Sequence, residues 1–240
     1  MKIRCVWEHH GGDSMLYAEN FTGAFTRGAS QEEAVQKMPE EIRRFQLWKG
    51  DAPADDYRIE IVQEKESDLQ VKDADSDVLF RTEQMPLSAE EYRELKSVAM
   101  KSAEDFHALY ASFPDKNKSA NPIRKTFYGA VPRTAEEMYQ HTKNVNAYYF
   151  SEIGVDAENE GTIVSCRAKG FAALESVPGF LSLEAVTGSY GERWSVRKVL
   201  RRFIWHDRIH AKAMFRMGML TFGADAIPDV FGFFHEIPVL

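Results

Sequence analysis

The longest helical pattern in the chain is VRKVLRRFIWHDRIHAKAMFRMGML, residues 196–220. Its apolar stripe steps alternately by three and four residues, which is the spacing of one face of an α-helix. The stripe consists of Val196, Val199, Phe203, His206, His210, Ala213, Met217 and Leu220. We therefore expect a helix from about Ser195 to Gly223, with two histidines in the middle of an otherwise apolar face.

The two histidines of this stripe have the spacing of a shared metal site. Residues four apart on a helix have Cβ atoms about 5–6 Å apart, and two imidazoles at that distance can bind one ion at about 2.0–2.1 Å from each nitrogen. Burying both rings without partners costs about 1–3 kcal/mol for each unsatisfied group. A third histidine, His141, lies between Met138 and Val145 on another predicted stripe. The spacing alone leaves two interpretations open: metal ligands, or core histidines with hydrogen-bond partners.

Three further helical patterns lie between residues 87 and 195. Two of them begin at capping boxes, Ser88-Ala-Glu-Glu and Thr134-Ala-Glu-Glu, in which hydroxyl and carboxylate side chains bond to free backbone N–H groups. The third runs from about Thr162 to Ser176. Together the four patterns predict a four-helix bundle over residues 87–240. The side chains expected to point inward on the second and third helices are Met138, His141, Val145, Tyr148, Val164, Ala168 and Phe171.

The first 66 residues have a different pattern. Short segments with alternating polarity, at residues 2–7, 15–19, 23–26 and 57–62, predict four strands. A capping box at Ser30 predicts one helix between the third and fourth strands. The expected order is βββαβ, a small sheet with one helix on a face. Residues 67–86 are rich in Asp, Glu, Ser and Lys, and we expect a solvated linker there. Within it, residues 78–80 could instead be a last strand or pack between the domains. The fold class is therefore α+β with two domains, 1–66 and 87–240.

Composition excludes some classes of function. The net charge is −7, which argues against general binding to nucleic acids or to anionic membranes. No run of eighteen apolar residues is present, so we expect no membrane span. Two distant cysteines, Cys5 and Cys166, cannot form a disulfide framework. We expect reduced thiols and a cytoplasmic location.

The helical region resembles the DinB superfamily of metalloenzymes, also called DinB/YfiT-like. The matching segments are EMYQH at residues 137–141 and LRRFIWHDRIH at residues 200–210. Members of this family have one histidine midway along the second helix and an H-x-x-x-H pair on the fourth. The resemblance implies that His141, His206 and His210 bind one divalent metal ion, with zinc or nickel the expected metal.

The resemblance also implies a kind of chemistry. Three protein ligands leave a coordination position open, as in catalytic metal sites. Characterised relatives include transferases and isomerases that use low-molecular-weight thiols. We therefore expect a metal-dependent transferase or hydrolase that acts on a small molecule, with such a thiol as a second cofactor. A homodimer is also expected, since relatives often dimerise and the tail at residues 227–234 is apolar.

Other polar residues near these histidines have two interpretations. Asp207 could be a partner of the ligands or a base. Tyr148 and Tyr149 could line the opening of the site, although core packing is favoured for both. For Asp207 the sequence favours a solvent-facing acid, and for Arg201, Arg202 and Arg208 it favours a solvated helix face. Cys166 is expected to be a small buried side chain.

The first 65 residues resemble the HicB-like antitoxin domain. The matching segments are YAENF at residues 17–21, GAFTRG at 23–28 and SQEEA at 30–34. Antitoxins of that family usually carry an added DNA-binding module, and none is recognisable in this sequence. The DNA-binding role is therefore not transferred, and the partner of this domain stays open.

Two alternatives compete with the metalloenzyme hypothesis. The segment HDRIH at residues 206–210 approximates the zincin motif HExxH, with the shorter Asp207 in place of the Glu base and His235 or Glu236 as a third ligand. The helical stripe argues against it. The second alternative is a non-catalytic binding or regulatory protein, in which the metal is structural and the HicB-like domain docks a partner. An open site would favour catalysis, and a site sealed by apolar side chains would favour the structural role.

Overall fold

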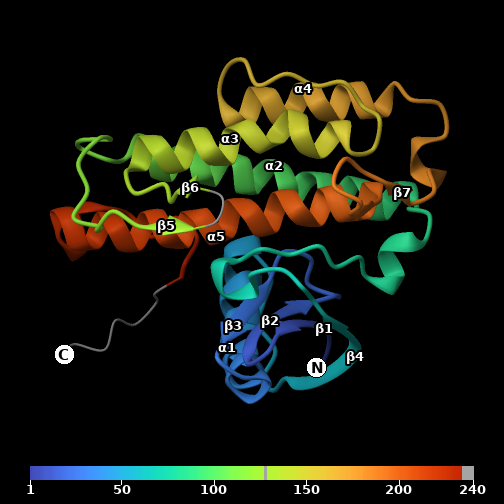
Figure 1. Cartoon of the computed structure of the whole chain (residues 1–240), viewed down its shortest axis with the longest axis horizontal. Helices are drawn as coiled ribbons and strands as arrows, with labels where there is room; N and C mark the ends of the chain where they lie inside the picture. The colour runs from blue at the N-terminus through green and yellow to red at the C-terminus, as the bar shows by residue number, and fades with distance from the viewer. Residues whose placement is uncertain (127–128, 234–240) are drawn as a thin grey trace. The chain divides into compact units, whose positions relative to one another are not determined.

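The computed structural model describes residues 1–126 and 129–233 (Figure 1). Within them the protein is α+β, with five α-helices and one mixed four-stranded sheet. It divides into two compact units. The sheet unit comprises Met1–Leu95 and Gly179–Trp205, and the helical unit comprises Lys96–Pro178 and His206–Leu240.

The sheet unit begins with the predicted βββαβ order. Its strands are β1 (Lys2–His10), β2 (Asp13–Ala18), β3 (Phe25–Gly28) and β4 (Arg58–Glu66), and its helix is α1 (Gln31–Lys49). The strands lie in the order β3-β2-β1-β4, with β1 antiparallel to β2 and parallel to β4. The Ser30 hydroxyl accepts a hydrogen bond from the Glu33 N–H, so α1 begins where the capping box predicts.

Residues 67–86 do not form the expected solvated linker. Val71, Val78 and Phe80 are buried, and the Tyr17 ring lies 5.6 Å from the ring of Phe80 and 6.2 Å from that of Trp205. The face of the sheet that carries Tyr17 is therefore covered by this segment and by the beginning of the last helix. The compact units also differ from the expected domains, 1–66 and 87–240, since the sheet unit includes residues 87–95 and Gly179–Trp205 as well as this segment.

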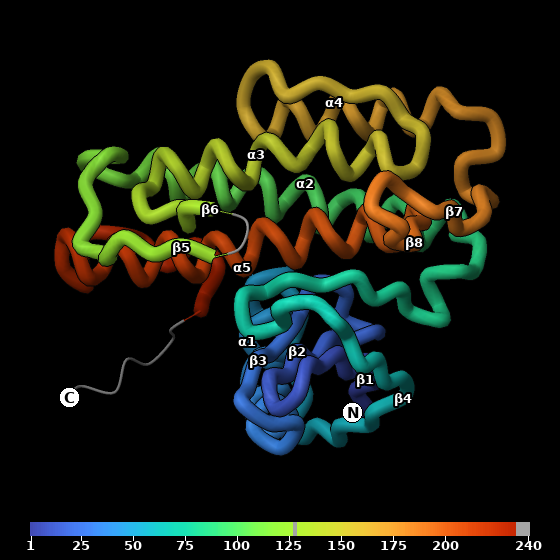
Figure 2. The backbone as a smooth tube through the Cα atoms, viewed as in Figure 1, coloured from blue at the N-terminus to red at the C-terminus, as the bar shows by residue number. Residues whose placement is uncertain are grey.

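Four further helices follow the sheet. They are α2 (Ala89–Ala111), α3 (Ala135–Ser151), α4 (Ile163–Glu175) and α5 (Val196–Phe222). The described chain also contains two hairpins, β5–β6 (Lys125–Thr126, Gly129–Ala130) and β7–β8 (Val186–Thr187, Arg193–Trp194), and four short 3-10 turns, Val71–Asp73, Arg81–Gln84, Phe180–Ser182 and Ala224–Ala226. Figure 2 shows the β7–β8 hairpin directly before α5. The division between the units falls inside α2 and α5.

Aromatic contacts hold the helices of the helical unit together. The rings of Phe106 on α2 and Tyr139 on α3 stack at 6.1 Å, and those of Phe150 on α3 and Phe171 on α4 meet edge to face at 5.4 Å. The helices begin at hydroxyl caps close to the predicted residues, since Thr134 and Thr162 each accept a hydrogen bond from a backbone N–H in the first turn.

The predicted helix faces are correct in part. Ala168 and Ala213 are exposed, and Leu220 is 66% exposed, although all three were expected to point inward. The buried face of α5 instead includes Asp207, Arg208, Ala211 and Met214. Counting apolar residues alone misplaces the face because this core also contains charged side chains.

The apolar tail packs onto its own chain in the part that is described. Ile227, Phe231 and Phe233 are buried, and the Arg208 guanidinium lies 5.2 Å from the centre of the Phe233 ring. A Cβ on Gly218 would lie 2.8 Å from Ile227. Phe234 falls outside the described residues. None of the described helices is long and apolar enough to cross a membrane.

Gly23 is a point of close packing in the sheet unit. It has φ +102, and a Cβ there would lie 2.2 Å from Cγ2 of Ile204. Gly50 has a similar φ of +91 but no neighbour within 4 Å. We expect Gly23→Ala to lower the free energy of unfolding by about 1–3 kcal/mol more than Gly50→Ala, since both add backbone strain and only the first adds overpacking. Urea denaturation measures the difference, and equal losses would contradict the predicted clash.

Glu8 is a buried carboxylate that joins β1 to the segment after β4. One of its oxygens accepts hydrogen bonds from the N–H groups of Asp77 (3.0 Å) and Val78 (3.2 Å), and the other accepts from the Tyr17 hydroxyl at 3.0 Å. Burial raises the pKa of Glu8, and these donors oppose that rise. The folded state therefore binds a proton at Glu8 more tightly than the unfolded state does.

This raised pKa predicts a pH dependence of stability. Between the unfolded and the folded pKa of Glu8, the folded state holds more protons, so stability falls as pH rises through that window. We expect the stability of the wild type to fall relative to Glu8→Gln, whose amide does not titrate, as pH rises from about 4 to about 8. Urea unfolding of both proteins at several pH values measures this. A constant difference across the range would show that the Glu8 pKa is not raised.

Candidate metal centre

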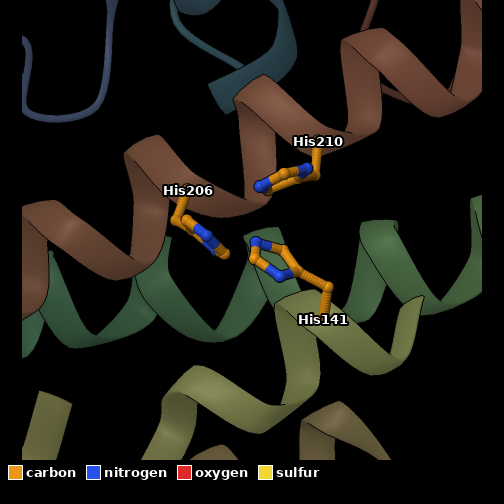
Figure 3. Close-up of side chains that lie close together, drawn as sticks. All are labelled: His141, His206 and His210. Carbon is orange, nitrogen blue, oxygen red and sulfur yellow. The ribbon is translucent and has the colours of Figure 1, made fainter. Parts of the chain in front are cut away.

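Three histidines come together between two helices of the helical unit. His206 and His210 lie one turn apart on α5, and His141 lies on α3. In Figure 3 the three rings point toward one another. The ring centres are 4.4 Å apart for His206 and His210, 4.6 Å for His141 and His210, and 5.2 Å for His141 and His206. The structure therefore brings together the histidines that the sequence pointed to.

The donor set and its geometry fit a divalent ion. One ring nitrogen from each histidine lies within 4.8 Å of the other two. Tetrahedral zinc at about 2.0–2.1 Å from each nitrogen places its ligand atoms about 3.3 Å apart. The ring nitrogens must therefore approach one another by up to about 1.5 Å to bind one ion. Neutral imidazoles are also the ligands that zinc and nickel share.

The three histidines differ in their exposure to solvent. His206 is 7% exposed, His210 is partly exposed and His141 is exposed. The prediction of a core position for His141 is therefore wrong. The buried face of α3 runs through Met138, Tyr139 and Thr142, so His141 lies at its edge.

The surroundings of these rings favour their neutral forms. Burial lowers the pKa of His210 to about 3, and the neighbouring His141 lowers it further when charged. Although His141 is exposed as a whole residue, partial desolvation by its neighbours also lowers its pKa. A neutral imidazole has a free lone pair, and metal binding requires this form. Both rings are therefore available to a metal at neutral pH without a prior loss of protons.

Asp207 lies between the two α5 histidines in sequence but points into the core. It is fully buried and forms an ion pair with the buried Arg167 of α4, with Nη1 to Oδ2 and Nη2 to Oδ1 both at 3.1 Å. The Ser102 hydroxyl of α2 donates to Oδ2 at 2.6 Å. Burial raises the pKa of Asp207, and Arg167 opposes this rise. The interpretation of Asp207 as a solvent-facing acid is therefore wrong.

The engaged carboxylate of Asp207 also argues against the zincin alternative. A zincin base must reach the metal-bound water, whereas both oxygens of Asp207 bond to Arg167 or Ser102 in the core. The proposed third ligands of that alternative, His235 and Glu236, lie outside the described residues.

Of the two tyrosines that the sequence offered for the opening of the site, Tyr149 lies next to the histidines. The ring of Tyr149 lies 5.9 Å from that of His206, edge to face, and its side chain is buried. Tyr148 is half-buried, and the centre of its ring lies 5.6 Å from that of Tyr149. The expected core packing is therefore confirmed for the side chain of Tyr149.

The other candidates lie elsewhere. Arg201 and Arg202 belong to the sheet unit and are buried, and Arg208 is buried in the helical unit, so the prediction of a solvated face is wrong for all three. Cys166 is buried as expected and is a free thiol. The only group of three or more potential ligands in the described part of the chain is the histidine triad.

No family model matches the chain, and neither a curated protein nor a solved structure matches it significantly.

The ion pair of Asp207 and Arg167 predicts a large effect of removing one partner. We expect Asp207→Asn to lower the free energy of unfolding by about 3–5 kcal/mol, because it leaves the Arg167 charge buried without its counter-ion. Asp156 is exposed, and Asp156→Asn serves as the control with the same chemical change. Urea denaturation compares the two. A loss for Asp207→Asn as small as that for Asp156→Asn would contradict a buried pair.

Proposed function

We propose that this protein is a metal-dependent enzyme of the DinB type. His141, His206 and His210 hold one divalent ion, zinc or nickel, and the substrate is a small molecule. The reaction class is thiol transfer or hydrolysis, with a low-molecular-weight thiol as the co-substrate of the transfer. In this proposal the helical unit is a DinB-type four-helix bundle, and residues 1–66 are a HicB-like domain whose partner is open.

The solvent exposure of His141 carries the catalytic part of this proposal. A structural zinc site is closed by four protein ligands, whereas a catalytic site has three and an open position. The described residues offer three histidine ligands, and one of them is exposed. A small molecule can therefore reach the ligand atoms from the side of α3.

The histidines and Asp207 have different parts in the proposed chemistry. The histidines bind through neutral rings, and the low pKa of His210, about 3, keeps protons from competing. The bound ion lowers the pKa of a water or thiol ligand. Asp207 does not act as a base, because its carboxylate is engaged in the core. Proton transfer therefore involves the solvent-facing side of the site.

The two cysteines support the proposed cytoplasmic location. Cys5 and Cys166 are both free and buried, and burial raises the pKa of Cys5 to about 12. Such thiols are poor nucleophiles. The thiol of the proposed transfer is therefore a separate molecule and not a side chain of this protein. Dimerisation stays a prediction, since the described tail packs on its own chain.

Metal binding is the first test. Calorimetric titration of tag-free protein with zinc is expected to show about one ion per chain, and His210→Ala is expected to abolish it, since two ligands remain. His10→Ala removes an exposed histidine of the sheet unit and is expected to leave binding unchanged. Absence of both zinc and nickel binding by the wild type would reject the proposal.

Metal-loaded protein then separates the two reaction classes. Thiol transfer requires the low-molecular-weight thiol and consumes it in proportion to product, whereas hydrolysis proceeds without it. Metal binding without either activity would favour the alternative in which the ion only stabilises the helices.

A further inference from the structure

The ion pair in the core of the helical unit is placed where it can set the rotation of α5. Asp207 follows the ligand His206 and precedes the ligand His210 by three residues. Successive residues of an α-helix are turned by about 100°. When Asp207 points into the core, His206 and His210 lie about 100° and about 60° from it, on the same flank of the helix. That flank faces His141 on α3 (Figure 3).

We propose that Arg167 and Asp207 are positioning residues, which hold His206 and His210 in line with His141. The inference rests on the proposed metal site. Neither residue touches the metal in this view. Their contribution is to define one rotation of α5, and the arrangement of the ligands follows from that rotation.

The bonding of the pair requires this rotation. Asp207 accepts two parallel hydrogen bonds from Arg167 at 3.1 Å and one from Ser102 at 2.6 Å, and Arg167 Nη1 also donates to the carbonyl of Ala99 at 3.3 Å. These bonds join α5 to α4 and α2 at one depth in the core. Bidentate Arg–carboxylate pairs add geometric specificity as well as energy. A turn of α5 by one residue would break all three bonds of Asp207 and leave the charge of Arg167 buried without its counter-ion.

The apolar contacts of α5 do not supply this specificity. Ala211 and Met214 are also buried on the face of Asp207, and hydrophobic contact is non-directional. These apolar contacts therefore set no direction for a side chain, whereas the hydrogen bonds of Asp207 do. A rotation of α5 moves His206 and His210 relative to His141, which belongs to a different helix.

A paired apolar replacement separates positioning from stability. Replacing a buried ion pair by apolar residues of similar size is often neutral or stabilising. We therefore expect the double variant Arg167→Met, Asp207→Val to fold with near wild-type stability in urea. Its zinc affinity is expected to fall roughly 10–100-fold, the usual effect of losing residues that orient ligands.

A second readout does not need the metal. The ring centres of His141 and His210 are 4.6 Å apart, so the metal-free protein is expected to show a nuclear Overhauser effect between their ring protons. The double variant is expected to lose it. Met214→Leu changes a buried side chain of the same helix at nearly constant volume, and it is expected to retain both the signal and the zinc affinity.

The outcomes distinguish this inference from the proposed function. A folded double variant with unchanged zinc affinity and an unchanged signal overturns the positioning role. If the wild type binds no metal but the double variant loses the signal between His141 and His210, the positioning role is supported and the metal function is rejected. If the double variant does not fold, Arg167→Lys keeps the charge and removes the fork. An unaltered signal between His141 and His210 in that variant would also overturn the inference, and a weakened signal would support it.

Discussion

The buried ion pair of Arg167 and Asp207 is the constraint on which the arrangement of the helical unit depends. Three helices meet at it, because Arg167 comes from α4, Asp207 from α5 and Ser102 from α2. The pair lies in a core that is otherwise closed by aromatic contacts. Apolar contacts have little directional requirement, whereas a desolvated charge requires its counter-ion at hydrogen-bonding distance. The energetic cost of any other arrangement is therefore concentrated at one point.

The sheet unit uses the same kind of contact in its own core. Arg201 donates to the carboxylate of Glu83 at 2.5 Å and to the carbonyl of Val78 at 2.8 Å, and its guanidinium lies 4.0 Å from the centre of the Phe80 ring. These contacts join the first part of α5 to the segment that precedes α2. Together with Glu8 they explain why a polar stretch of sequence is an ordered part of this core, since its backbone groups satisfy buried charges.

The histidine site combines a buried and an exposed side. His206 and Tyr149 belong to the core, whereas His141 lies at the edge of α3 and is exposed. A ligand set held by packing on one side and open on the other is suited to an ion that must exchange a ligand during reaction. This geometry supports the proposal of a catalytic role over that of a purely structural one.

Local patterns in the sequence predicted the main helices and strands of this protein and indicated His141, His206 and His210 as candidate ligands. Capping residues such as Ser30 and Thr134 act within one turn, so the starts of their helices could be predicted. The spacing of His206 and His210 likewise follows from helix geometry. The tertiary structure alone decided which faces are buried. Asp207 was expected in solvent but is buried against Arg167. This partner lies forty residues away in sequence, so the pattern of α5 could not indicate it. Burial of a charge depends on a distant counter-ion, and periodicity within one helix contains no information about it.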